Sequence, residues 1–175
     1  MIFTETALPG AFVIEPELFR DERGFFSLIW SEKEFAEHGL ESRLVQCNVS
    51  FNLKKGTLRG MHYQLAPYTQ AKLVWCLRGS IYDVIIDLRR DSPTFRKWVA
   101  VDLSASNRLM LYVPKGMAHG FQTLEDNTEV FYQMSEVYAP ESASGVRWND
   151  PAFSITWPAD PRTIIDRDQN YPDFN

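Results

Sequence analysis

Three residues suited to acid–base and anion chemistry lie close together in an apolar stretch of the chain. Arg59 and His62 occur in LRGMHYQL, residues 58–65, and Lys72 follows in QAKLVWCL. Burying a charged group without a partner is costly, so these residues must be paired or must serve a site. His62 can exchange a proton near neutral pH, and Lys72 can stabilise a developing oxyanion.

Other residues could complete such a site. Tyr132, in TEVFYQMSEVY, is a phenol able to return a proton, and Asp168, in IIDRDQNYP, is a carboxylate able to orient a histidine. Arg59 and Arg23, the latter in DERGFF, suit phosphate because a guanidinium binds its oxygens bidentately. Each residue taken alone also fits a structural role, as a hydrogen-bonded histidine or a packed tyrosine. Only their joint occurrence favours a site.

The elements that must position these residues read mainly as β-strands. Segments rich in β-branched and aromatic residues are separated by turn signals such as Lys55-Gly56 and Pro114-Lys115-Gly116. We expect strands within residues 23–30, 42–51, 57–65, 71–79, 80–88, 97–103, 108–113 and 128–138. Many short strands at even spacing favour a β-sandwich or small barrel.

Two helices are expected beside the strands. Ser31 can cap a helix over 31–39, Glu34 can close a capping box, and Gly39 can end it. The proline-containing stretch 151–175 predicts turns that wrap the barrel, with one short helix near 161–167.

Strand alternation places several polar residues on inward faces. His62 shares a face with Gln64, and Lys72 shares one with Val74 and Cys76. Tyr132 shares a face with Met134 and, if no bulge intervenes, with Tyr138. A barrel with such an interior is expected to hold one ligand.

Composition narrows the function classes. The length of 175 residues suits one domain, and the net charge of −5 argues against nucleic acid or an anionic membrane as the main partner. No apolar run approaches a membrane span, and the N-terminus MIFTETALPG lacks a secretory signal. Cys47 and Cys76 lie in separate strand-like runs and are expected to be buried thiols in a reducing cytoplasm.

Metal and nucleotide cofactors are not indicated. Metal-binding double-stranded β-helix (cupin) proteins often have two histidines one residue apart, but Gln64 follows His62 at that spacing. His119 lies in an expected turn in VPKGMAHGF, and His38 falls on the expected helix. Two histidines without a well-spaced carboxylate make a poor metal site. Neither GxGxxG nor GxxxxGK[ST] is present, so no NAD or ATP site is expected by those routes.

Six motifs resemble those of the dTDP-4-dehydrorhamnose 3,5-epimerase family. They occur in the family's order over nearly the whole chain: FRDERGFF, LRGMHYQ, QAKLVWCLRGSIYDVIIDLRRDSPTF, VPKGMAHGF, VFYQMSEVYAPESASGVRWNDP and IDRDQNYP. The resemblance implies an all-β, double-stranded β-helix (cupin/jelly-roll) barrel with a few short helices. It implies one epimerase domain over 1–175, metal-free and homodimeric, acting on a nucleotide-linked 4-keto-6-deoxyhexose.

The resemblance also implies roles for individual residues. His62 matches the family's base, Asp168 its orienting acid, Tyr132 the general acid and Lys72 the residue that steadies the enolate oxygen. Substrate contacts are implied for Arg23, Gln46, Asn48, Arg59, His119, Tyr138 and Arg167. Among these, Arg59 lies near the pyrophosphate, Tyr138 stacks on the base, and Arg23 reaches the partner subunit's site.

The implied reaction needs no cofactor, because a ketone at C4 acidifies the protons on C3 and C5. Two positions depart from the family pattern: Leu28 and Ala143 stand where the family usually has acids, although Glu141 is close. Leucine cannot accept a hydrogen bond from a base N–H, so nucleotides other than thymidine, the first choice, stay open. Inversion at C3, C5 or both is open. A metal-dependent cupin oxygenase or isomerase and a non-catalytic sugar-nucleotide binding protein are the alternatives.

Overall fold

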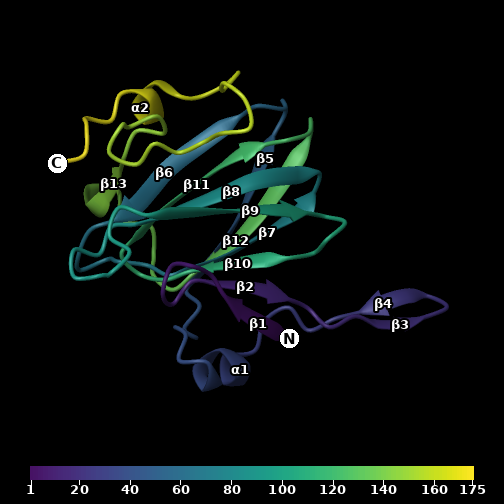
Figure 1. The fold of residues 1–175 in the computed structure, drawn as a ribbon. Helices are drawn as coiled ribbons and strands as arrows, with labels where there is room; N and C mark the ends of the chain where they lie inside the picture. Colours follow the sequence, from purple (N-terminus) through teal and green to yellow (C-terminus); the bar gives the residue numbers. More distant parts are fainter.

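Short strands dominate the computed structural model, which describes residues 1–175 (Figure 1). The strands are β1 (Ile2–Glu5), β2 (Phe12–Glu15), β3 (Phe19–Asp21), β4 (Gly24–Phe26), β5 (Gln46–Asn52), β6 (Leu58–Gln64), β7 (Lys72–Arg78), β8 (Ser80–Asp87), β9 (Trp98–Ser104), β10 (Met110–Val113), β11 (Met117–Thr123), β12 (Thr128–Met134) and β13 (Ala143–Gly145). The helical segments are α1 (Glu32–Glu37), the 3-10 turn η1 (Pro140–Ser142) and α2 (Asp166–Gln169).

From β5 to β12 the chain winds through two facing sheets. One sheet has the order β1-β2-β10-β7-β12-β5, and the other has the order β13-β6-β11-β8-β9. Antiparallel pairs nest within one another: β8 pairs with β9, β7 with β10, β6 with β11 and β5 with β12. This arrangement confirms the predicted all-β double-stranded β-helix with a few short helices.

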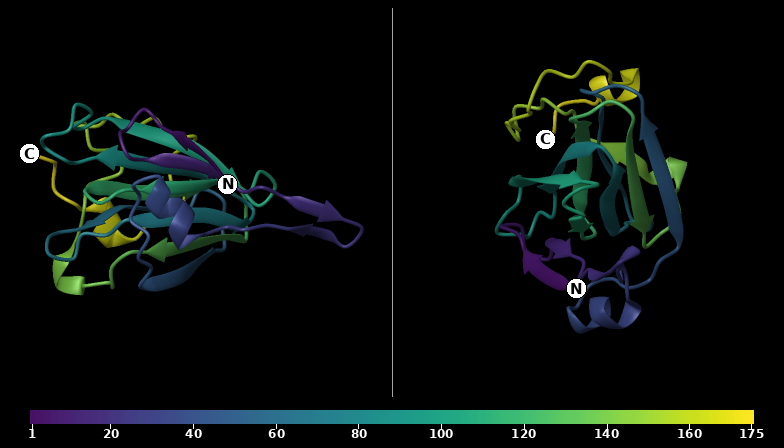
Figure 2. Two further views of the ribbon diagram at one scale, coloured as in Figure 1. Left: turned by 90° about the horizontal axis from the view of Figure 1, so that it is seen from below. Right: turned by 90° about the vertical axis from the view of Figure 1, so that its right-hand side faces the viewer.

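Three apolar clusters hold the layers together. Residues such as Val74, Ile85 and Leu111, drawn from both sheets, fill the space between them. Outside the first sheet, Phe35 of α1 packs with apolar side chains of β7 and β10. Outside the second sheet, the segment that contains Phe153 covers β6, β8 and β11. The right-hand view of Figure 2 shows α1 and the C-terminal segment on opposite sides of the barrel. Strands covered on both faces read as nearly continuous apolar runs, as β7 does.

A two-stranded hairpin, β3–β4, projects from the barrel (Figures 1 and 2). Its phenylalanines are exposed, with Phe19 at 55% and Phe26 at 72%. The predicted strand over 23–30 was too long, since only Gly24–Phe26 is a strand. Residues 23–30, RGFFSLIW, are as rich in aromatic and aliphatic residues as a buried strand, which explains the error.

The predicted helices exist with different bounds. Ser31 caps α1, and its hydroxyl accepts a hydrogen bond from the Glu34 N–H at 3.4 Å. The expected capping box does not close, because the Glu34 carboxylate binds the N-terminal amino group of Met1 at 3.1 Å. The second helix occupies Asp166–Gln169 rather than 161–167. Neither α-helix is long enough, or apolar enough, to pass through a membrane.

Two further expectations were wrong. Cys76 is buried, but the thiol-bearing residue Cys47 is exposed, because β5 forms the open edge of its sheet and Cys47 does not face the interior. Strands β1 and β2 were not anticipated, and β11 was assigned to a turn. The turn signal at Pro114-Lys115-Gly116 is genuine, yet the residues after it form a fully buried strand.

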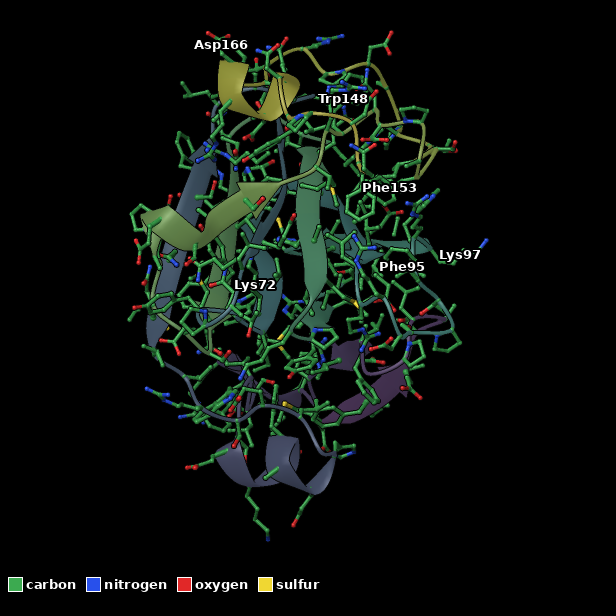
Figure 3. The ribbon with its side chains drawn as sticks, turned by 90° about the vertical axis from the view of Figure 1, so that its left-hand side faces the viewer. Lys72, Phe95, Lys97, Trp148, Phe153 and Asp166 are labelled. Carbon is green, nitrogen blue, oxygen red and sulfur yellow. The ribbon has the colours of Figure 1, made fainter.

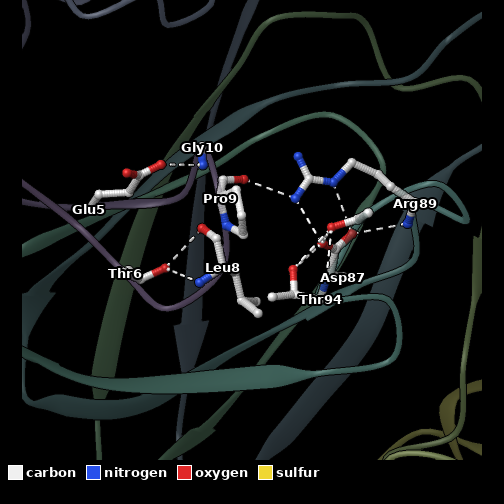
Figure 4. Close-up of polar contacts among 9 residues, drawn as sticks. Glu5, Thr6, Leu8, Pro9, Gly10, Asp87, Arg89 and Thr94 are labelled. Carbon is white, nitrogen blue, oxygen red and sulfur yellow. Dashed lines mark hydrogen bonds and ion pairs between the residues drawn. The ribbon is translucent and has the colours of Figure 1, made fainter.

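A buried carboxylate ties the N-terminal loop to the barrel. Asp87, at the end of β8, accepts hydrogen bonds from the guanidinium and backbone N–H of Arg89 and from the hydroxyls of Ser92 and Thr94. The same guanidinium donates to the carbonyl of Pro9 at 2.9 Å (Figure 4). These bonds hold the pKa of Asp87 well below its usual value, although burial alone acts to raise it.

Candidate active site

The candidate catalytic residues line one continuous hollow in the barrel. A cavity of about 320 Å³ adjoins a second of about 430 Å³. Residues common to both are His62, Lys72, Tyr132, Tyr138 and Arg167. They come from three strands, one loop and α2, so the fold brings together residues far apart in sequence.

A close approach of two glycines sets the position of the histidine strand. Gly60 of β6 has φ +125°, and a Cβ there would lie 2.6 Å from the Cα of Gly120 on β11. A side chain at either glycine would push β6 and β11 apart. On the same pair of strands, His62 lies directly opposite His119.

His62 contacts Asp168, its predicted partner. The imidazole Nε2 lies 2.8 Å from Oδ1 of Asp168, whose Oδ2 accepts the Gly60 N–H at 3.1 Å. Asp168 is buried at 1% exposure, and Arg167 also donates to it at 3.2 Å. Helix α2 therefore brings a carboxylate onto the back of the histidine strand.

The electrostatics of the pair favour a neutral His62 beside an ionised Asp168. Burial lowers the pKa of His62, the Asp168 carboxylate opposes this, and the cations of Lys72 and Arg167 add to the lowering. Burial acts to raise the pKa of Asp168, but hydrogen bonds from His62, Gly60 and Arg167 bring it below its usual value. Nε2 has two neighbours, the carboxylate of Asp168 at 2.8 Å, which only accepts hydrogen bonds, and Nη2 of Arg167 at 3.2 Å, which only donates. The shorter contact assigns the proton to Nε2 and leaves Nδ1 as the free base.

Lys72 is a buried ammonium at the start of β7. It is 8% exposed, and no hydrogen bond or ion pair to another residue satisfies it. Figure 3 shows Lys72 between the two sheets. Burial lowers the pKa of Lys72 to about 8, with the negative charge of Asp83 opposing the change. The side chain is thus mostly charged at neutral pH and available to an anion in the cavity.

Tyr132 lies in β12, between Val74 of β7 and Asn48 of β5. Burial raises the pKa of its phenol, and the charge of Arg59 partly offsets this. The phenol therefore stays protonated at neutral pH, as a proton donor must.

The predicted substrate contacts form a polar wall of the hollow. The Nε of Arg59 donates to Asn52 at 2.7 Å and its Nη2 donates to the carbonyl of Phe51 at 3.4 Å, which leaves Nη1 for an anion. Gln46 donates to Asn48 at 2.9 Å and accepts the Tyr138 N–H at 3.0 Å. Tyr138 lies in the loop after β12 rather than on the strand itself, yet it lines both cavities.

Two predicted contacts are placed differently from the rest. His119 is not in a turn but within β11, where it is 7% exposed and its Nε2 lies 2.7 Å from Oδ1 of Asp83. It still lines the larger cavity. Arg23 lies at the tip of the β3–β4 hairpin, 83% exposed and paired with Asp21, outside both cavities of this chain.

Sequence reasoning missed two residues that line the hollow and one buried acid that binds a lining histidine. Asp83 is fully buried on β8, and an acid inside SIYDVIID was the available signal. Tyr171, inside the motif IDRDQNYP, places its ring edge-on to His62 with centroids 6.4 Å apart. Gln70 lines the smaller cavity, and its Oε1 is buried without a partner. No local pattern marked Gln70.

The two departures from the family pattern fall in different places. Ala143, on β13, lines the smaller cavity together with Ser144. Leu28, which is 43% exposed, follows the hairpin and lines neither cavity of this chain. Glu141, the nearby acid, lies in η1 and lines neither cavity.

Metal ligands do not converge in this structure. No group of three or more His, Cys, Asp and Glu side chains is arranged to hold a metal ion. Each histidine of the hollow is instead bound to its own aspartate, His62 to Asp168 and His119 to Asp83.

Comparison with known proteins shows which family has this sequence and fold. The family model described as dTDP-4-dehydrorhamnose 3,5-epimerase matches residues 5–175. A curated enzyme of that description from Shigella flexneri is 43% identical over 171 residues, covering 97% of this chain and 94% of its own. The crystal structure of such an epimerase from Bacillus anthracis, with TDP and PPi bound, has a TM-score of 0.95 and 44% identity, covering 99% of both chains.

A variant of the reaction occurs among the structural neighbours. A 3′-monoepimerase from Streptomyces bikiniensis, solved in complex with dTDP-quinovose, has a TM-score of 0.88 and 33% identity. It covers 96% of this chain and 85% of its own. Given the full-length match, the nested strands and the His62–Asp168 pair facing Lys72 and Tyr132, this chain is an isomerase and belongs to the dTDP-4-dehydrorhamnose 3,5-epimerase family.

Proposed function

We propose that this epimerase acts on a dTDP-linked 4-keto-6-deoxyhexose, as one domain over residues 1–175, without a metal or cofactor. The single observation that carries the proposal is the hollow in which a histidine with a free Nδ1 meets an unpaired ammonium and a protonated phenol. The thymidine nucleotides bound to the related proteins from Bacillus anthracis and Streptomyces bikiniensis support the choice of dTDP.

The mechanism follows from the chemistry of these groups. His62 removes a proton next to the C4 ketone, and the ionised Asp168 stabilises the imidazolium that forms. Electron density moves to the ketone oxygen, where the ammonium of Lys72 stabilises the enolate. Tyr132 then donates a proton to the opposite face of the same carbon, which inverts it. The substrate carries its own electron sink, so the reaction needs no other group.

Recognition of the nucleotide is assigned to the polar wall. The guanidinium groups of Arg59 and Arg167 suit the pyrophosphate, and Gln46 and Asn48 offer amide groups beside them. Tyr138 is 51% exposed at the mouth of the hollow, where a base could stack on its ring. His119 contacts the bound sugar nucleotide from the larger cavity.

A homodimer is part of the proposal. Beside the exposed apolar residues of the hairpin, the edge strand β5 exposes Val49 and Phe51, at 58% and 45%, and Leu53, just after β5, is 66% exposed. Large exposed apolar side chains in such number are typical of an interaction surface. In a symmetric dimer the hairpin carries Arg23 into the partner's hollow. The two free thiols fit a cytoplasmic location.

The main experiment uses dTDP-4-keto-6-deoxyglucose in deuterated water, followed by NMR. We expect deuterium at the epimerised carbons, and the positions labelled will show whether C3, C5 or both are inverted. His62→Ala should lower exchange by on the order of 10²- to 10⁴-fold. His38→Ala removes an exposed histidine directly after α1 and is the matched control. Wild-type exchange in folded His62→Ala protein would refute the assignment of the base.

Subunit mixing tests the role of Arg23. If Arg23 acts across the dimer, Arg23→Ala and His62→Ala subunits complement one another, and about a quarter of the sites in a random mixture become intact. Mixing His62→Ala with Tyr132→Phe is the control, because both residues belong to one hollow and no intact site can form. A mixture of Arg23→Ala and His62→Ala with no recovered activity would place Arg23 outside the partner's site.

A further inference from the structure

Asp83 is a buried carboxylate to which the proposed mechanism gives no task. It lies in the middle of β8 with 0% exposure. Its Oδ1 lies 2.7 Å from Nε2 of His119, while its Oδ2 is buried and has no hydrogen-bond partner. An unpaired buried carboxylate oxygen costs free energy, so its retention calls for a physical reason.

An unpaired charge of opposite sign, that of Lys72, faces the same interior as Asp83. Alternation along β8 puts Asp83 on the same face as Ile81 and Ile85, and both of those residues belong to the cluster between the sheets. Alternation along β7 puts Lys72 on the face of Val74, a member of the same cluster. The ammonium and the carboxylate therefore project into one interior from opposite sheets.

Most other charged groups around Lys72 are themselves cationic, and they disfavour the protonated form of its side chain. His62 and Arg59 of β6 and Arg167 of α2 face it across the hollow, and they are cations or potential cations. Tyr132 and Tyr138 are neutral phenols, and His119 is bound to Asp83.

The other acids near Lys72 are already paired with other residues. Asp168 is bound to His62. On the outer side of β7, Lys72 borders a small cavity with Glu41, Arg43 and Tyr112, but Glu41 is paired with Lys115 at 2.7 Å. Asp83 is thus the one acid of the interior with an oxygen left for Lys72.

We infer that Asp83 is a positioning residue for Lys72, supplying from within the barrel the negative charge that keeps the buried ammonium protonated for the enolate. The inference rests on the proposed role of Lys72. His119 is needed because it satisfies one oxygen of Asp83 and directs the other into the interior. The negative charge of Asp83 opposes the lowering of the Lys72 pKa by burial, which agrees with this role.

The test measures the titration of Lys72 directly. The chain has six lysines, so ¹³C-labelled lysine side chains give a simple NMR spectrum, in which Lys72→Arg identifies the signal of Lys72. In Asp83→Asn we expect the pKa of Lys72 to fall by about one unit or more, as expected when a nearby opposite charge is lost. Asp83→Glu, which keeps the charge, should restore part of the shift.

Asp87→Asn is the matched control. It removes a second fully buried carboxylate from the same strand, but that carboxylate is occupied by Arg89, Ser92 and Thr94. Asp87→Asn should leave the pKa of Lys72 unchanged. Equal values for Lys72 in the wild type and Asp83→Asn would overturn the inference.

A reciprocal measurement covers the case in which Asp83→Asn does not fold. In Lys72→Met, the ¹³C signal of the Asp83 carboxyl should move from its wild-type position, because the cation that faces it is lost. An unmoved Asp83 signal overturns the inference as well.

Activity separates this inference from the proposed function. Asp83→Asn should lose turnover first on the alkaline side, with the falling limb of the pH profile moved about one unit toward acid. A merely structural role would lower turnover equally at every pH. Wild-type turnover in Lys72→Met overturns the role of Lys72 and, with it, the purpose assigned to Asp83. An inactive Lys72→Met with an unmoved Lys72 titration in Asp83→Asn overturns the inference alone.

Discussion

Replacing Asp168 with asparagine probes the base through its partner. The substitution keeps the shape of the side chain and removes its charge, so the hydrogen bond at 2.8 Å from His62 loses its ionic character. Three influences lower the pKa of His62, namely burial, Lys72 and Arg167, and only Asp168 raises it. Loss of the carboxylate must therefore move the pKa of His62 further down.

The size of the effect follows from the geometry. A hydrogen bond to a charged group contributes about 1.5–3 kcal/mol. At about 1.4 kcal/mol for each pKa unit, this corresponds to a fall of about one to two units. The same energy is lost when the imidazolium forms during proton removal, so the plateau rate should drop by about 10- to 100-fold.

Deuterium exchange into the substrate, measured from pH 5 to 8, gives both quantities. The rising limb of the profile should move toward acid and the plateau should fall. Asp166→Asn, at an exposed position on the same helix, is the control and should reproduce the wild-type profile (Figure 3). A limb that stays in place or moves toward alkali in Asp168→Asn would refute the account of this pair.

Three further predictions concern the support of the site and the nucleotide. Gly145→Ala would put a Cβ 2.4 Å from the ring of Tyr171, so we expect kcat/KM to fall about tenfold or more, and wild-type kinetics would contradict this. Asp87→Asn should cost about 3 kcal/mol in urea unfolding at pH 7. Because the folded-state pKa of Asp87 is lowered, that difference should shrink as the pH falls below about 4, and a pH-independent difference would argue against it. Arg59→Lys keeps the charge but loses the planar fork, so calorimetry should show dTDP binding weakened by about 1–3 kcal/mol.

The strands that surround the site were predictable because the pattern of apolar and turn residues within each segment is sufficient to indicate a strand. Alternation or apolar runs bounded by turn residues placed β6, β7 and β8 within one residue of their observed bounds, whereas β12 ends at Met134 rather than at Tyr138. The same reasoning put His62, Lys72 and Tyr132 on inward faces, where they line the hollow. Asp168 was identified through its motif, and the structure places it in contact with His62.

Other features depend on contacts that a local pattern does not contain. The sequence predicts a turn at β11 because Pro114 and Gly116 immediately precede it, while the burial of β11 comes from the neighbouring β6 and β8. Asp83 was overlooked because an acid in a strand usually faces solvent, and its partner His119 lies on another strand. In the homodimer that we propose, the hairpin that carries Arg23 lies against a second subunit, so contacts within one chain do not position it.

The most direct test of the mechanism separates removal of the proton from its return. In Tyr132→Phe, which keeps the ring and its packing in β12, His62 can still form the enolate and return a proton to the original face. Deuterium exchange and inversion are measured by NMR on one sample of the dTDP-4-keto sugar. We predict that Tyr132→Phe continues to incorporate deuterium while inverted product is almost absent. Undiminished inversion in Tyr132→Phe would contradict the account and make another group the acid, with Tyr138 the next candidate.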